Sequence, residues 1–474
     1  MFYLADPPVV DTGNTAWLLV SSALVLLMTP GLAMFYGGLN RSKGVLNMMM
    51  MSFSSIGLIS VLWLLYGFSL SFGSNSNDSA NNIIGSFTQY LGNKNFIAEV
   101  WGASETSPDG IGVPTYVFLA FQMMFAIITV ALISGALSDR AKFGGWLLFA
   151  AGWFTLVYVP VAHWVWGGGF IGGKIHALDF AGGTAVHINA GAAALAVALV
   201  LGKRAGWPRE SFRPHNVPLV ALGAGLLWFG WFGFNAGSEL TVDSVAGIAF
   251  INTQVATAAA VLGWIIVEWL RDGKPTLVGA SSGAVAGLVA ITPACGFIAP
   301  YASVLLGLVA GAVCAYAVSL KYKLGYDDSL DVVGVHFVGG WIGSLWIGLF
   351  ATIGINPALA DGLGAEEGLL YGGGVTQLGR QALASIIVTV CSFGIAYGLA
   401  FLIDKTVGFR ATPEAESDGI DLTEHAEAGY DLSPSGGGGG GAFTLAGVAA
   451  TGGTSAPAKA GKPAAKSVSP KATG

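Results

Sequence analysis

Charged residues are scarce in this chain. Only 10% of its 474 residues are Asp, Glu, Lys or Arg, whereas 54% are hydrophobic. A soluble globular protein carries about 25% charged residues, so the composition excludes a soluble domain and indicates a protein that crosses a membrane several times. Cysteine is scarce too. The three cysteines, Cys295, Cys314 and Cys391, lie in apolar segments, which excludes a disulfide framework and predicts buried, unreactive thiols.

Apolar runs of membrane-spanning length recur along the chain. The N-terminus lacks the basic stretch of a cleavable signal peptide, so the first run is expected to stay as a helix. A helix needs roughly 20 apolar residues to cross the hydrocarbon core, and this rule predicts an all-α membrane protein with eleven transmembrane helices. They are expected near 15–37, 44–73, 114–137, 144–165, 180–202, 216–237, 245–270, 276–297, 300–320, 333–352 and 380–404.

Basic residues gather in alternate loops, and this pattern predicts the orientation. The intervening loops hold little more than Lys94 and Lys174. Because loops rich in Lys and Arg stay in the cytoplasm, we expect the N-terminus outside and the C-terminus inside, which requires an odd number of helices. The basic loops contain Arg41 and Lys43; Arg140 and Lys142; Lys203, Arg204, Arg209 and Arg213; Arg271 and Lys274; and Lys321 and Lys323.

Two segments share one spacing, an aspartate followed eight positions later by a histidine and small residues. The first, DFAGGTAVHINAGAAALA, contains Asp179 and His187, and the second, DSLDVVGVHFVGGWIGSL, contains Asp328 and His336. Ionisable residues at membrane depth are costly and usually functional. Eight residues carry each histidine about 12 Å into a core roughly 30 Å thick, and the two segments enter from opposite faces. Both histidines are therefore expected near the midplane of an inverted repeat of five plus five helices, with 380–404 outside it.

These residues also have ordinary structural explanations. A single histidine is most simply a hydrogen-bonding residue between helices, but two at matched depth favour a pair that faces one lumen. Each aspartate opens a helix, where a carboxylate accepts backbone N–H bonds. We prefer this capping role for Asp328, and for Asp179 we add a negative charge near the outer mouth that favours a cation. Neither His187 nor His336 has a further metal ligand at a suitable spacing, so we expect no metal or other cofactor.

Aromatic residues crowd three of the predicted helices. AHWVWGGGF contains Trp166, WFGWFGFNAGSE contains Trp231, Phe234 and Ser238, and FQMMFAIITVAL contributes Phe125. Some of them fit the aromatic belt found at membrane interfaces. The alternative is a cation–π cage, which suits ammonium-type ligands.

With these segments the chain resembles the ammonium transporter family (Amt/Mep/Rh), bacterial Amt type, from about residue 13 to 431. The match to DFAGGTxVHINAG is long and specific, and six further segments support it. They are PGLAMFYGGLNRSKGVLN, FQMMFAIITVAL, VAHWVWGGGF, GWFGFNAGS, DDSLDVVGVHFVGG and DGIDLTEHAEAGY. The resemblance implies a homotrimer in the cytoplasmic membrane, one pore per subunit, and ammonium transport rather than enzyme activity.

The resemblance also assigns roles by position. It places an outer ammonium-recruitment site at Trp166, Ser238 and Phe125, and a phenyl gate at Phe125 and Phe234. A second set of residues matches the pore and its outer mouth. His187 and His336 match the twin histidines, and Asp179 matches the family's essential aspartate. One residue departs from the pattern, because Phe337 follows the second histidine where the family commonly has glycine, and this leaves the width of the lumen unpredicted.

Energetics favour one transport mechanism. Moving an intact cation into a narrow apolar pore costs at least several kcal/mol, whereas removing a proton from an amine whose pKa lies about two units above ambient pH costs roughly 3 kcal/mol. We therefore expect deprotonation outside, passage of ammonia, and a separate, electrogenic proton relay. Three alternatives stay open: a channel that passes ammonia without net charge, a sensor that signals through its tail, and a membrane metalloenzyme. The sequence of 405–474 contains no recognisable output domain, which argues against the sensor. Metal ligands beside the two histidines are lacking, which argues against the metalloenzyme.

The predicted transmembrane domain covers 1–404, and two different segments follow it. Residues 405–432 are polar and are expected to regulate transport by packing on cytoplasmic loops of a neighbouring subunit. By resemblance, a PII-type signalling protein is the expected soluble partner; no nucleic acid is expected. Residues 433–474 begin with a glycine run and continue with Ala, Pro, Lys and Ser, a composition that predicts disorder.

Overall fold

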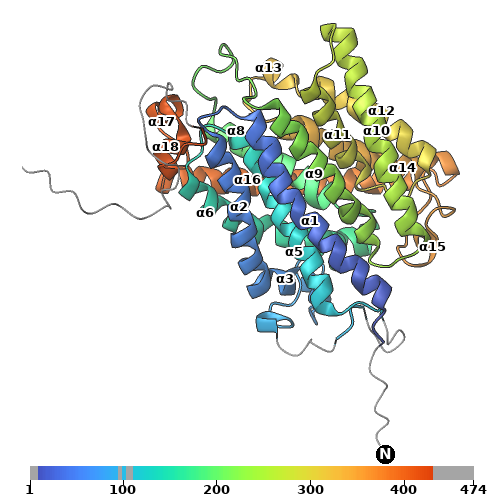
Figure 1. Ribbon diagram of the computed structural model, residues 1–474. Coiled ribbons are helices and arrows are strands. Elements are labelled where there is room, and N and C mark those ends of the chain that lie inside the picture. The colour runs from blue at the N-terminus through green and yellow to red at the C-terminus, as the bar shows by residue number, and fades with distance from the viewer. Residues whose placement is uncertain (1–8, 94–98, 103–109, 431–474) are drawn as a thin grey trace, which may run out of the picture. The chain divides into compact units, whose positions relative to one another are not determined.

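The computed structural model describes residues 9–93, 99–102 and 110–430, and all regular structure in this part of the chain is helical (Figure 1). The segment 433–474, predicted to be disordered, lies outside the described residues. Within these described ranges, extended segments pair only at two isolated bridges, Val100 with Pro114 and Ala141 with Arg410. The all-α prediction is therefore confirmed.

Ten helical segments of the described residues are long and apolar enough to cross a membrane. They are α1 (Thr12–Leu39), α2 to α3 (Val45–Phe72), α5 with η3 (Thr115–Leu137), α6 to η5 (Phe143–Ile175), η6 with α8 (Gly183–Leu201), α9 with η7 (Val217–Glu239), α10 (Ser244–Asp272), α12 with α13 (Pro300–Leu324), η8 with α14 (Val333–Phe350) and α16 (Thr376–Thr406). The run predicted at 276–297 forms α11 (Leu277–Ile291), which has only 15 residues. At 1.5 Å per residue it is about 22 Å long, shorter than the hydrocarbon core.

The two Asp–His segments adopt the same local structure. His187 lies in the π-helical turn η6 (Gly183–Ile188), which continues as α8 (Asn189–Leu201). His336 lies in the π-helical turn η8 (Val333–Phe337), which continues as α14 (Val338–Phe350). Such π-helical turns are rare in proteins, and those that do occur are often found at functional sites. The repeated sequence spacing is thus matched by a repeated distortion of the helix.

Small residues bring α1 and α9 (Val217–Ala236) together. A Cβ atom at Gly223 would lie 2.3 Å from the backbone nitrogen of Phe35, and one at Gly38 would lie 2.7 Å from that of Val220. Only glycine allows this approach. Helix α1 consequently lies against both α9 and α5 (Thr115–Ile133) (Figure 1), and the three helices form much of the wall of the site described below.

A buried charge cluster joins the loops at one end of the helices. Arg204 donates to both carboxylate oxygens of Asp327, at 2.9 Å from Nε and 2.8 Å from Nη2, and Arg140 Nη1 lies 3.3 Å from the same carboxylate. Burial acts to raise the pKa of Asp327, but the hydrogen bonds from Arg204 and the charge of Arg140 together lower it. Two of the basic residues that served to predict the orientation are therefore partners in ion pairs.

The C-terminal helices α17 (Pro413–Asp418) and α18 (Ile420–His425) pack against this same end. The Asp421 carboxylate accepts hydrogen bonds from the backbone N–H groups of Leu46, at 3.0 Å, and Asn47, at 2.8 Å, at the start of α2 (Val45–Leu62). His425 Nε2 lies 2.9 Å from Asn47 Oδ1, and its ring meets Phe143 edge-on at 5.1 Å. These contacts join the C-terminal helices to α2 and to Phe143 of the same chain.

Candidate functional site

Three residues from separate elements line one cavity of about 280 Å³, which we call the outer cavity after the predicted outer site. Trp166 ends α7 (Val159–Trp166), Phe125 lies on α5, and Ser238 lies in η7 (Gly237–Glu239). The rings of Phe125 and Trp166 are perpendicular, with centroids 6.1 Å apart. The Ser238 hydroxyl donates to the carbonyl oxygen of Phe234 at 2.7 Å, so its lone pairs can accept a hydrogen bond. The structure thus brings together the residues predicted for an outer site.

A pair of stacked phenyl rings closes the inner end of this cavity. The ring centroids of Phe125 and Phe234 are 4.1 Å apart and the planes differ by 26°. Phe125 lines the outer cavity, and Phe234 lines a second cavity on the other side. Both side chains are about 1% exposed. The pair therefore separates the two cavities, as a gate would.

The inner cavity is narrow and almost entirely apolar. Its volume is about 10 Å³, close to the space of one water molecule. Two of its lining residues, His187 and His336, are ionisable. The others are Met28, Leu32, Phe35, Ile128, Leu132, Val186, Leu227, Trp231, Phe234 and Val285.

The two histidines meet in this cavity. Their Nδ1 atoms are 3.3 Å apart and their ring centroids 5.4 Å apart. A hydrogen bond between two nitrogens uses one proton, so one ring donates it and the other accepts it. Among the described residues, His187 Nε2 has no hydrogen-bond partner although it is buried. A buried nitrogen without a partner is costly, and the residue that carries it lines the inner cavity.

Both aspartates of the repeated segments cap the turns that carry the histidines. The Asp179 carboxylate accepts five hydrogen bonds, four from backbone N–H groups of residues 182–185 and one from the Thr184 hydroxyl. The Asp328 carboxylate accepts two, from Val332 at 3.1 Å and Val333 at 2.7 Å. Asp179 also has a link to the outer cavity, because its carbonyl oxygen accepts a hydrogen bond from Trp166 Nε1 at 2.9 Å. Asp328 lies in the other repeat.

Trp231 is a site residue that the sequence reasoning missed. We interpreted its segment as partly an interfacial belt, but its side chain is 2% exposed and its ring lies 5.5 Å from that of His187. Its Nε1 donates to Thr292 Oγ1 at 2.7 Å, which fixes the ring. The signal was present in the spacing of Leu227, Trp231 and Phe234, which places the three on one face of α9.

Phe337 packs between helices, outside the inner cavity. It is not among the residues that line the inner cavity. Its Cβ atom fits against Gly191 of α8, where a Cβ on the glycine would lie 2.6 Å away, and its ring lies 6.4 Å from that of Trp341. The larger side chain is accommodated between helices rather than in the inner cavity.

His163 holds the outer end of α7 in place. The side chain is fully buried, with Nδ1 2.8 Å from the carbonyl oxygen of Ser71 and Nε2 2.5 Å from that of Asn81. It therefore connects the helix of Trp166 to the end of α3 (Phe68–Phe72) and to α4 (Asp78–Asn81). In the part of the chain that the structure describes, no group of three or more His, Cys, Asp or Glu side chains is placed to hold a metal ion.

Comparisons with known proteins point to one family. The chain is 57% identical over 439 residues to an ammonium transporter of Mycobacterium tuberculosis, covering 89% of this chain and 91% of the relative. It is 48% identical over 422 residues to an ammonium transporter of Bacillus subtilis, covering 89% and 99%. The crystal structure of Candida albicans Mep2 has a TM-score of 0.78 at 33% identity, covering 90% of this chain and 94% of that one. The sequence model of the Ammonium Transporter Family matches residues 16–430, and the chain therefore belongs to this family.

Proposed function

We propose that this protein carries ammonium across the cytoplasmic membrane as ammonia and a proton, which cross separately. The ion binds at Trp166, Phe125 and Ser238 and loses a proton near Asp179. Ammonia then passes the Phe125–Phe234 pair and the inner cavity, while His187 and His336 relay the proton. The observation that carries this proposal is the histidine pair, with 3.3 Å between Nδ1 atoms, in a lumen otherwise lined by apolar and aromatic side chains.

The outer cavity suits a small cation. Two aromatic faces attract positive charge through their quadrupoles, and the Ser238 hydroxyl, which donates to Phe234, keeps lone pairs for an N–H donor. The phenyl pair then excludes an ion with its water shell, because the rings are in contact at 4.1 Å. Potassium has no proton to lose, so it stays outside.

The histidine pair suits a proton relay. Because one proton lies between the two Nδ1 atoms, the outward nitrogens of the two rings have opposite roles, one a donor and the other an acceptor. When the accepting outward nitrogen takes up a proton, the shared proton passes to the other ring, which releases the proton of its own outward nitrogen, and the two roles are then exchanged. A proton accepted at one end and released at the other moves charge through the pair without an ion entering the lumen.

The architecture completes the proposal. We infer eleven transmembrane helices, with α11 as the short member, an outside N-terminus, an inside C-terminus and a homotrimer. We also propose that residues 405–432 regulate transport and that a PII-type protein binds at the cytoplasmic face. The relatives named ammonium transporters and the match over residues 16–430 support this extension.

Current measurements separate this mechanism from a channel for neutral ammonia. Purified protein in vesicles on a solid-supported membrane should give a transient current after an ammonium jump and none after a potassium jump. The integrated charge should grow in proportion to the ammonium taken up. Ammonium uptake without any current would overturn the electrogenic mechanism and favour the neutral channel.

A change at the outer site should weaken affinity more than maximal rate. In Trp166→Leu we expect the half-saturating ammonium concentration to rise about tenfold, since a desolvated cation–π contact contributes about 1–2 kcal/mol. The matched control is Trp164→Leu, because Trp164 lies in the same helix but does not line the cavity. Concentration series of the ammonium current measure both variants; equal effects would remove Trp166 from the binding site.

The contacts of the C-terminal helices should affect the transport rate but should not be needed for trimer assembly. Asp421→Ala removes the carboxylate that accepts two backbone N–H bonds at the start of α2, a loss of about 1 kcal/mol for a helix cap. We expect an altered current and an unchanged mass by size-exclusion chromatography with light scattering. Asp418→Ala, at an exposed position of α17, should change neither. A dissociated trimer in Asp421→Ala would contradict a purely regulatory role.

A further inference from the structure

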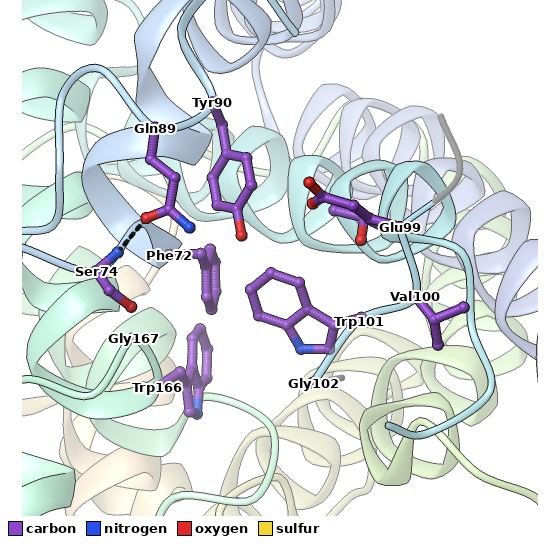
Figure 2. Close-up of a pocket in the computed structure, with 11 residues that line it drawn as sticks. Phe72, Ser74, Gln89, Tyr90, Glu99, Val100, Trp101, Gly102, Trp166 and Gly167 are labelled. Atoms are coloured by element: carbon purple, nitrogen blue, oxygen red, sulfur yellow. Dashed lines mark hydrogen bonds between the residues drawn. The ribbon is translucent and has the colours of Figure 1, made fainter. Parts of the chain in front are cut away.

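A second and larger cavity adjoins the outer cavity. Its volume is about 700 Å³, and Figure 2 shows that its lining side chains come from the end of α3, the residues near Gln89 and Trp101, and the end of α7. Three residues, Phe72, Trp101 and Trp166, line both cavities. The two spaces are therefore neighbours that share an aromatic wall, and we call the larger one the antechamber.

The aromatic walls of the antechamber are held rigidly. The Trp101 ring stacks on Phe118 with centroids 3.9 Å apart and planes 12° apart, and it meets the Phe72 ring edge-on at 5.9 Å. Its backbone is fixed as well, since Trp101 N donates to the carbonyl oxygen of Val113 at 2.8 Å. Tyr90 adds a further ring. A set of fixed aromatic faces around one space is a preorganised surface for a cation.

One carboxylate gives the antechamber its charge. Glu99 lines it together with ten residues that include no Lys, Arg or His. In Figure 2 its side chain is directed toward the space that also holds the Tyr90 hydroxyl and the Trp101 ring. The charge of Glu99 acts on the Tyr90 phenol. The pKa of Tyr90 is raised, mainly by burial and secondly by the negative charge of Glu99. The antechamber therefore combines a negative group with aromatic faces.

The size of the antechamber indicates its ligand. A space of about 700 Å³ lies in the range of sites for organic molecules, roughly 300–1,000 Å³, and far exceeds the needs of an ammonium ion. We propose that the antechamber binds organic ammonium cations, at a site beside the recruitment site at Trp166, Phe125 and Ser238, with which it shares the Trp166 wall. Such cations stop at the stacked Phe125–Phe234 pair. If ammonium enters through the outer cavity, as the proposed function requires, they also compete with it.

A binding titration tests the site without reference to transport. Tetramethylammonium is the probe, since it has no N–H proton to lose, and tert-butanol serves as a neutral molecule of similar size. Isothermal titration of the purified full-length protein should show saturable binding of the cation and none of the alcohol. Glu99→Gln should weaken that binding roughly fivefold or more, as expected for loss of one charge at contact distance. Asp78→Asn, at an exposed position of α4 that does not line the cavity, should leave it unchanged.

A transport measurement tests the competition. Tetramethylammonium should raise the half-saturating ammonium concentration of wild-type protein, and Glu99→Gln should reduce this effect while keeping the maximal current. A protein that gives no ammonium current refutes the proposed function, but its titration still decides the site. Absence of tetramethylammonium binding, or equal binding by wild type and Glu99→Gln, overturns the inference.

Discussion

Replacing both lumen histidines, His187→Ala with His336→Ala, should abolish the current that an ammonium jump drives through the protein. The two rings are the ionisable side chains of the inner cavity, and their Nδ1 atoms are within hydrogen-bonding distance. Without them a proton has no relay between the outer site and the far side of the lumen. A charge must then cross apolar surroundings at a cost of about 3 kcal/mol or more, which corresponds to a current roughly 100-fold smaller.

Two further measurements make this result specific. A dye that reports pH inside the vesicles detects ammonia that still enters after the current has been lost, and we expect this neutral flux to continue because the alanines widen the lumen. Potassium jumps test selectivity. His176→Ala is the control, since His176 lies outside the inner cavity, with its ring against the carbonyl oxygen of Leu363. A double variant that kept both its current and its exclusion of potassium would show that the relay is wrong.

The sequence predicted the meeting of the two histidines better than the helices that carry them. The eight-residue spacing of Asp179 and His187, repeated at Asp328 and His336, sufficed to predict a pair that meets in the core, because helical rise and membrane thickness are fixed quantities. The structure places the two Nδ1 atoms 3.3 Å apart. The π-helical turns at both histidines were not predictable, since periodicity assumes a regular helix.

Other features depended on contacts that no local pattern records. The run at 276–297 was apolar enough for a span, but its helix ends at Ile291. Arg140 and Arg204 were used only to predict the orientation, and the sequence did not show that each is buried beside Asp327, more than a hundred residues away in the sequence. The sequence around Trp231 is typical of an aromatic residue at the membrane interface, but its ring lies beside that of His187. In each case the tertiary partner decides the role, and the sequence alone does not show the partner.

The second large effect is expected at Asp179. The Asp179 carboxylate accepts five hydrogen bonds with its two oxygens. In Asp179→Asn only one oxygen remains as an acceptor, and the amide NH2 group that replaces the other oxygen faces backbone N–H groups, to which it cannot bond. Each buried donor left without a partner costs about 1–3 kcal/mol. We expect lower thermal stability, measured by intrinsic fluorescence in detergent, and an ammonium current at least about 100-fold smaller, as for loss of several kcal/mol at the site.

Asp328→Asn is the matched variant that separates capping from participation in transport. Asp328 caps η8 as Asp179 caps η6, and each turn carries one of the two histidines. If both aspartates act only as caps, the two variants should lose current in proportion to the stability that they lose. If the negative charge of Asp179 also stabilises the cation beside Trp166, Asp179→Asn should lose current far beyond that proportion and also show a higher half-saturating ammonium concentration. We expect the second outcome, because the backbone carbonyl oxygen of Asp179 accepts the N–H of Trp166 and so places this residue next to the outer cavity, whereas Asp328 has no such link. Proportional losses in both variants would reduce Asp179 to a structural cap and leave the removal of the proton to the histidine pair.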